Sequence, residues 1–116
     1  MTEIISSVIC ERVDDLGHGR FNYTGVVNVF HGLGPDYFEL ALNYRTDDLE
    51  INERVTVLSP TGKVLVEAHE QFDPGSYYFT SIHEMDIDFE EAGTYTIGIL
   101  VNGLKRSIPF EVIIPN

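Results

Sequence analysis

The chain contains a single cysteine, Cys10, and no tryptophan. One cysteine cannot form a disulfide within the chain, and small secreted domains usually depend on such bridges for stability. We therefore expect a cytoplasmic protein. Glu11 lies beside Cys10 and opposes the low thiol pKa that a nucleophilic cysteine needs, so we expect Cys10 to be a small buried apolar side chain.

Basic side chains are also scarce, with 7 lysines and arginines against 19 aspartates and glutamates. The formal net charge of -12 repels nucleic acid phosphates and anionic membranes. We therefore expect neither nucleic acid nor a membrane as a partner. An acidic surface keeps many proteins soluble, and charge alone indicates no specific function.

No segment is apolar for long enough to span a bilayer, which takes about 20 residues. Near the beginning of the chain, Glu3 interrupts a short and mixed apolar stretch, so we expect no signal peptide. The 116 residues match the size of one ordinary domain, and no linker or internal repeat divides them. We expect a single domain over residues 1–116.

Helical periodicity is missing as well, and apolar residues alternate with polar ones instead. Within Glu84–Phe89, for example, Met85, Ile87 and Phe89 share one face and acidic residues occupy the other. This pattern is typical of half-buried strands in antiparallel sheets. Eight strands are predicted, at Glu3–Glu11, Phe21–His31, Asp36–Arg45, Glu53–Leu58, Lys63–Glu70, Ser81–Phe89, Thr94–Val101 and Lys105–Ile113.

Turn-forming residues separate these strands. Ser59–Lys63 reads SPTGK and predicts a hairpin, and Asn102-Gly103 is the dipeptide that type I′ turns favour. Strands at this spacing, without helices between them, predict an antiparallel two-sheet sandwich of seven to eight strands. Pro109 lacks the backbone N–H that a ladder requires, so we expect its strand, Lys105–Ile113, to lie at a sheet edge or to carry a bulge at Pro109.

One segment carries a recognisable corner. Glu90–Ile99 reads EEAGTYTIGI and resembles the acidic-Ala-Gly-x-Tyr corner of immunoglobulin-like domains, in which the tyrosine hydroxyl bonds back to the upstream backbone. The resemblance implies an immunoglobulin-like sandwich with structural roles for Gly93 and Tyr95. Ile97 stands where an antibody-type domain has its second cysteine, so the chain departs from that subclass.

A second resemblance covers more of the chain. Cys10 lies in the first expected strand, GVVNVF in the second, LSPTGKVL forms a hairpin, and AGTY follows. This order resembles a family of small bacterial proteins, also found around mobile elements, whose function is unknown. The resemblance implies a β-sandwich and adds no activity.

No residue pattern indicates catalysis, a cofactor or a metal. The sequence has four histidines, at His18, His31, His69 and His83. None has a metal-ligand spacing, and we expect all four on the surface or in loops. Carboxylates gather at 47–53 and along 84–90, but alternate side chains on a strand lie about 7 Å apart, too far for one ion. Glycine-flanked serine and phosphate-loop motifs are absent, so we expect no catalytic, cofactor-binding or metal-binding residue.

The remaining candidate is the aromatic run Tyr77-Tyr78-Phe79, which cannot place all three rings in one core. We expect it to be a contact surface or, alternatively, to cover a sheet edge within the monomer. The leading hypothesis is a non-enzymatic interaction module that acts through an unidentified protein partner or a weak homodimer. An alternative is an acidic inhibitor, related to phages or mobile elements, whose carboxylates mimic DNA and whose binding depends steeply on salt. A small metal-dependent hydrolase is the third hypothesis.

Overall fold

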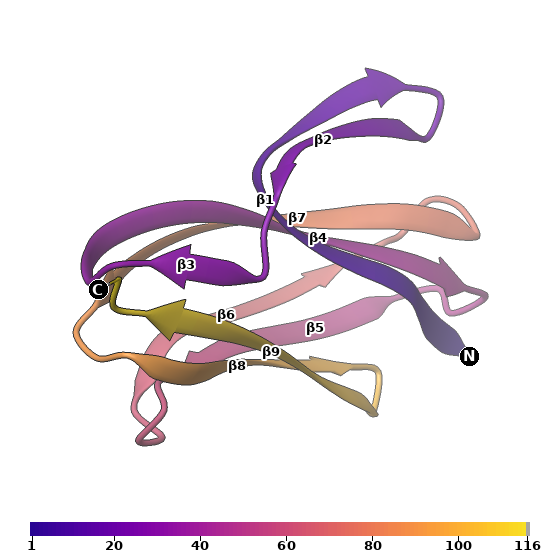
Figure 1. Ribbon diagram of the computed structural model, residues 1–116. Coiled ribbons are helices and arrows are strands. Elements are labelled where there is room, and N and C mark those ends of the chain that lie inside the picture. The colour runs from indigo at the N-terminus through magenta and orange to yellow at the C-terminus, as the bar shows by residue number, and fades with distance from the viewer. Residues whose placement is uncertain (116) are drawn as a thin grey trace.

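The computed structural model describes residues 1–115, which form nine β-strands in two sheets (Figure 1). No helix occurs in this part of the chain, so the fold belongs to the all-β class, as predicted. Accordingly, residues 1–115 offer no helix that is long and apolar enough to span a membrane.

One sheet has four strands in the order β2-β1-β4-β7, and each neighbouring pair is antiparallel. Its strands are β1 (Thr2–Gly17), β2 (Arg20–Val26), β4 (Gly34–Thr46) and β7 (Tyr78–Phe89). The alternating residues Phe38, Leu40, Leu42 and Tyr44 of β4 are fully buried against the other sheet. The alternation in the sequence therefore predicts the inward face of this central strand correctly.

The other sheet has five strands in the order β3-β9-β8-β5-β6. Its strands are β3 (Val29–His31), β5 (Ile51–Leu58), β6 (Val64–Phe72), β8 (Gly93–Val101) and β9 (Leu104–Ile113). Only the β3–β9 pair is parallel among the described strands. The predicted turns at 59–63 and 102–103 both join antiparallel neighbours, and the positive φ of Asn102 (45°) and Gly103 (83°) fits a type I′ turn.

The predicted count of seven to eight strands is wrong because Phe21–His31 is not one strand. The chain leaves the four-stranded sheet after Val26 and joins the five-stranded sheet at Val29. At the crossing, the Val27 N–H donates to the Ile9 carbonyl at 2.8 Å, and the Asn28 carbonyl accepts from the Glu111 N–H at 3.0 Å. Residues 26–29 read VVNV, and Gly25, with a φ of 67°, directly precedes them as a local sign of the change of sheet.

The expected edge position of the last strand also needs correction. β9 lies between β8 and β3, so it is not the outermost strand of its sheet. However, β3 pairs only with Glu111–Ile113, which leaves the β3 side of Pro109 without a ladder partner in residues 1–115. The short strand β3 thus pairs with the C-terminal end of β9, beyond Pro109, and needs no backbone N–H from the proline.

Aromatic rings fill the end of the core near β3. Phe30 lies 5.3 Å from Phe38 and 5.4 Å from Phe110 between ring centroids, and Phe89 lies 5.1 Å from Tyr95. Tyr95 also stacks on Phe110 at 5.3 Å. These five buried rings come from both sheets, so their contacts join the two layers.

A β-hairpin formed by residues 13–26, which we call the arm, rises from the four-stranded sheet (Figure 1). The arm contacts the outer face of that sheet, where the Val13 N–H donates to Glu39 Oε1 at 2.7 Å and Asn43 Nδ2 donates to the Tyr23 hydroxyl at 3.1 Å. Tyr37 also donates to Glu39, and this hydrogen bond raises the pKa of Tyr37 to about 12. Glu39 is therefore buried although it lies on the outward face of β4.

The corner between β7 and β8 is closed by Tyr95, whose hydroxyl donates to the Glu91 carbonyl at 2.6 Å. Gly93 has a φ of 135°, which side-chain-bearing residues rarely adopt. A Cβ atom on Gly93 would lie 2.9 Å from Cγ of Pro60, closer than carbon atoms pack. The β5–β6 turn therefore packs directly against the corner.

Gly93→Ala is expected to lower the free energy of unfolding by about 1–3 kcal/mol, because it adds backbone strain and a contact with Pro60. Gly75→Ala is the control, since Gly75 also has a positive φ (71°) but has open space around its Cβ position. Denaturant melts compare the two variants. An equal loss in both would show that the approach of Pro60 adds nothing at the corner.

Candidate functional site

Exposed apolar side chains gather at the end of the molecule formed by the loops β4–β5 and β6–β7. Leu49 is 91% exposed, Tyr77 is 70% exposed and Tyr78 is 65% exposed. We call these three residues the loop-end surface. Tyr77 lines two hollows, of about 410 and 320 Å³, which lie against both loops and against Arg45 of β4. The loop-end surface thus has protruding apolar side chains with a hollow on either side of Tyr77.

Phe79 differs from the two tyrosines that precede it. Its ring is half-buried, stacks on Tyr44 at 4.8 Å and meets Phe72 edge-on at 5.6 Å. Phe79 therefore belongs to the packing between the sheets, while Tyr77 and Tyr78 point outward. The structure accordingly leaves only Tyr77 and Tyr78 of the aromatic run available for contacts.

Carboxylates surround the loop-end surface, with Asp47 and Asp48 in one loop and Asp73 in the other. Asp48 accepts hydrogen bonds from the Thr2 hydroxyl at 2.5 Å and from Asn102 Nδ2 at 3.0 Å. These hydrogen bonds lower the pKa of Asp48 to about 2. Asp48 is therefore ionised at neutral pH, and its contacts tie the loop to β1 and to the β8–β9 turn.

A buried polar cluster lies between the sheets, centred on Glu53 of β5, which is 1% exposed. His83 and Ser81 of β7 donate to Glu53 Oε1 at 2.8 and 2.9 Å, and the Tyr44 hydroxyl donates to Oε2 at 2.5 Å. Burial favours the neutral carboxyl, but the three hydrogen bonds outweigh it and hold the pKa of Glu53 below its usual range. The cluster joins the sheets through an ionised, fully bonded carboxylate.

Ser81, His83 and Glu53 include the residue types of a hydrolytic triad, but their geometry differs from one. In a triad, the carboxylate binds Nδ1 of histidine and the serine hydroxyl binds Nε2. Here both Glu53 and Ser81 lie at Nε2 of His83, at 2.8 and 3.0 Å. Because Nε2 donates to Glu53, it cannot accept the serine proton, and Ser81 itself is buried.

The prediction that all four histidines are exposed is wrong for His83, which is 7% exposed. The sequence contained the signal, because His83 precedes Met85, Ile87 and Phe89 by the two-residue period of their inward face. Glu53 was missed in the same way. Glu53 belongs to the acidic group at 47–53, yet it alternates with the buried Ile51 and Val55.

Cys10 is fully buried, as predicted, and its Sγ lies 3.4 Å from the Arg12 carbonyl and 3.7 Å from the Glu39 carbonyl. Burial raises the pKa of the thiol, which disfavours the reactive thiolate. Among residues 1–115, no three His, Cys, Asp or Glu side chains come together in a way that could hold a metal ion. The acidic residues Glu84, Asp86 and Asp88 are exposed along β7, as their alternation predicts.

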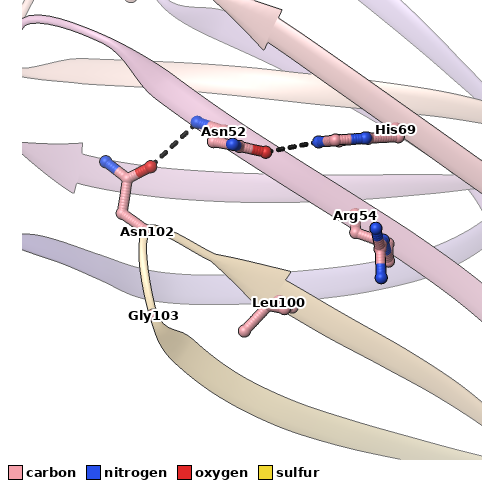
Figure 2. Close-up of a pocket in the computed structure, with 6 residues that line it drawn as sticks. All are labelled: Asn52, Arg54, His69, Leu100, Asn102 and Gly103. Carbon is pink, nitrogen blue, oxygen red and sulfur yellow. Dashed lines mark hydrogen bonds between the residues drawn. The ribbon is translucent and has the colours of Figure 1, made fainter.

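A further hollow, of about 260 Å³, lies on the outer face of the five-stranded sheet beside the β8–β9 turn (Figure 2). Its walls are formed by Asn52, Arg54, His69, Leu100, Asn102 and Gly103. Figure 2 shows Asn52 between two partners. Its N–H donates to Asn102 Oδ1 at 2.8 Å, and its Oδ1 accepts from His69 Nε2 at 2.5 Å.

No protein-family model matches the chain, and a search of curated proteins finds no match. The geometry of the surfaces is therefore the basis on which a function is proposed.

Proposed function

We propose that the chain is a non-enzymatic, cytoplasmic protein-interaction module that makes its contacts through the loop-end surface. The observation that carries this proposal is the exposure of Leu49, Tyr77 and Tyr78 together at one end of a strongly charged protein. Grouped apolar side chains with a polar rim are typical of protein contact sites, in which tyrosine is enriched. The carboxylates of Asp47 and Asp73 supply such a rim.

We further propose that the fold is a variant of the immunoglobulin-like sandwich. The order β9-β8-β5-β6 matches strands G, F, C and C′ of that fold, and β1-β4-β7 matches A, B and E. The hydrogen bond from Tyr95 lies at the E–F corner of this assignment. In this strand assignment, one end of the sandwich carries the loop with Leu49, the loop with Tyr77 and the β8–β9 turn. Antibody variable domains bind antigen at the same end, which supports the proposed contact surface.

The partner is either another protein or a second copy of this chain. A net charge of -12 on each copy opposes self-association, and apolar contact between two loop-end surfaces favours it. These opposing contributions predict a weak homodimer, while a partner with a basic rim would bind with electrostatic support.

Replacing Leu49 and Tyr77 together with serine is expected to weaken self-association at least about 10-fold, because it removes the most exposed apolar side chains of the surface. Sedimentation equilibrium over a range of concentrations measures the association, and a denaturant melt checks that the variant folds. Serine at Leu16 and Val26 is the control, since both are exposed apolar residues of the arm.

A wild-type dimer that persists in the Leu49/Tyr77 variant would contradict the assignment of the contact surface. A wild type that is monomeric at every concentration would eliminate the homodimer and leave a different protein as the partner.

A second candidate function is an acidic inhibitor that mimics DNA. It is supported by Glu84, Asp86 and Asp88, which are exposed in a row on β7 and take part in no ion pair within residues 1–115. Such a mimic would bind a basic nucleic-acid enzyme, and its affinity would fall steeply with salt. Apolar contact through Leu49 and Tyr77 would respond little to salt, so a titration with salt distinguishes the two functions.

A further inference from the structure

We propose that the hollow beside Arg54 binds a carboxylate carried by an acidic peptide segment of a partner protein. This site lies on the outer face of the five-stranded sheet and is separate from the loop-end surface. The inference therefore does not depend on the contact surface proposed above. We call it the Arg54 hollow, and its binding groups are Asn52 and Arg54.

The hollow presents hydrogen-bond donors at its wall. Asn52 Oδ1 is occupied by His69, whereas the Nδ2 of Asn52 has no partner within residues 1–115. The guanidinium of Arg54 is about half exposed and carries a fork of N–H groups that fits both oxygens of a carboxylate. Asn52 and Arg54 lie two residues apart on β5, so both side chains project from the same face of the sheet.

Strand register places a second cation on the same face of the sheet. Arg54 lies opposite His69 on β6 and opposite Leu100 on β8, and Leu100 lies opposite Lys105 on β9. The row His69-Arg54-Leu100-Lys105 therefore crosses four strands of the outer face. Arg54 and Lys105 therefore share a row that contains no acidic residue.

The walls of the hollow are held in place before any ligand binds. Asn102 accepts from the Asn52 backbone at 2.8 Å, and its Nδ2 donates to the Glu50 carbonyl and to Asp48, both at 3.0 Å. These bonds fix the β8–β9 turn against β5. A preformed wall reduces the ordering cost that binding would otherwise incur.

A single carboxylate of a peptide matches the size of the hollow. The volume of about 260 Å³ accommodates one side-chain group. Arg54 already has an intramolecular carboxylate nearby, since its Nε lies 3.9 Å from Glu67 Oε1. That pair is long and solvent-exposed, so an incoming carboxylate with better geometry can displace it.

Titration with tetraglutamate, followed by NMR in low-salt buffer, tests the proposal. We expect tetraglutamate to shift the signals of the Asn52 side-chain amide and the Gly103 backbone amide. Arg54→Gln is expected to weaken this binding about 10-fold or more, because it removes a charge-assisted pair of hydrogen bonds. Arg12→Gln is the matched control. It makes the same charge change on an exposed arginine that pairs with Asp14, and it should change the affinity less than about 2-fold.

Three results would overturn the proposal. Tetraglutamine that binds as well as tetraglutamate would show that the carboxylate is not recognised. An equal loss of affinity in Arg54→Gln and Arg12→Gln would indicate a general charge effect. Inorganic phosphate that shifts the same signals, without any effect of tetraglutamate, would assign the hollow to small oxyanions instead.

Discussion

Glu53→Ala is expected to lower the free energy of unfolding by about 3–5 kcal/mol, which makes it one of the most damaging single substitutions in the chain. The substitution removes the shared acceptor of His83, Ser81 and Tyr44 from the space between the sheets. Tyr44 would remain buried without a partner, Ser81 and His83 would keep only each other at 3.0 Å, and each unsatisfied group costs about 1–3 kcal/mol. Chemical denaturation of the wild type and the variant measures the difference.

Glu53→Gln is the control for charge. It keeps an acceptor oxygen but loses the ionised group, so we expect a smaller loss of about 1–3 kcal/mol. The two variants separate the contribution of the charge from that of the hydrogen-bond geometry. Equal stability of Glu53→Ala and the wild type would show that the cluster does not hold the sheets together.

The difference in stability between the wild type and Glu53→Gln should depend on pH, because the pKa of Glu53 is lowered. A carboxylate with a depressed folded pKa stabilises the fold fully above its unfolded pKa of about 4.3, and this contribution is lost as the pH falls through the folded pKa. The stability difference between the wild type and Glu53→Gln should therefore shrink on acidification below about pH 4. A difference that grows as the pH falls would contradict the ionised state of Glu53.

Tyr95→Ala is the second substitution with a large expected effect, a loss of about 3–5 kcal/mol. The Tyr95 ring is buried, contacts Phe89 and stacks on Phe110, so its removal opens a cavity at the centre of the aromatic core. Its hydroxyl also closes the corner through Glu91. Denaturant melts measure the loss relative to the wild type.

Tyr95→Phe separates the contribution of the corner hydrogen bond from that of ring packing in the core. It retains the ring and removes only the hydrogen bond to Glu91, so a loss of about 1 kcal/mol is expected. A Tyr95→Phe variant as unstable as Tyr95→Ala would mean that the hydroxyl, not the ring, dominates. No loss in Tyr95→Ala would contradict the buried position of the ring.

Alternation of apolar and polar residues was sufficient to predict the class of fold and much of the core. It identified the inward faces of β4, β7, β8 and β9, because a strand with one buried face must alternate. It did not reveal that the chain changes sheets between Val26 and Val29. The choice of sheet there depends on pairing with Ile9 and Glu111, which lie far away in the sequence.

The candidate sites were predicted less completely. The run Tyr77-Tyr78-Phe79 predicts a contact surface, but Phe79 packs inward, and Leu49 joins the tyrosines only because two loops meet at one end of the fold. The buried Glu53–His83 contact links residues 30 positions apart, so local sequence cannot show it, although the alternation of each strand marks both residues as inward. The Arg54 hollow likewise depends on the register of β5 with β6 and β8.

Site-specific photo-crosslinking at position 77, in the native host, tests the central claim that the loop-end surface contacts another protein. A photoreactive phenylalanine analogue replaces Tyr77 in one variant and Asn22 on the exposed face of the arm in the other. The account predicts a discrete adduct from position 77, either with a second copy of the chain or with one other protein, and none from position 22. The absence of an adduct from position 77, or the same adducts from both positions, would contradict it.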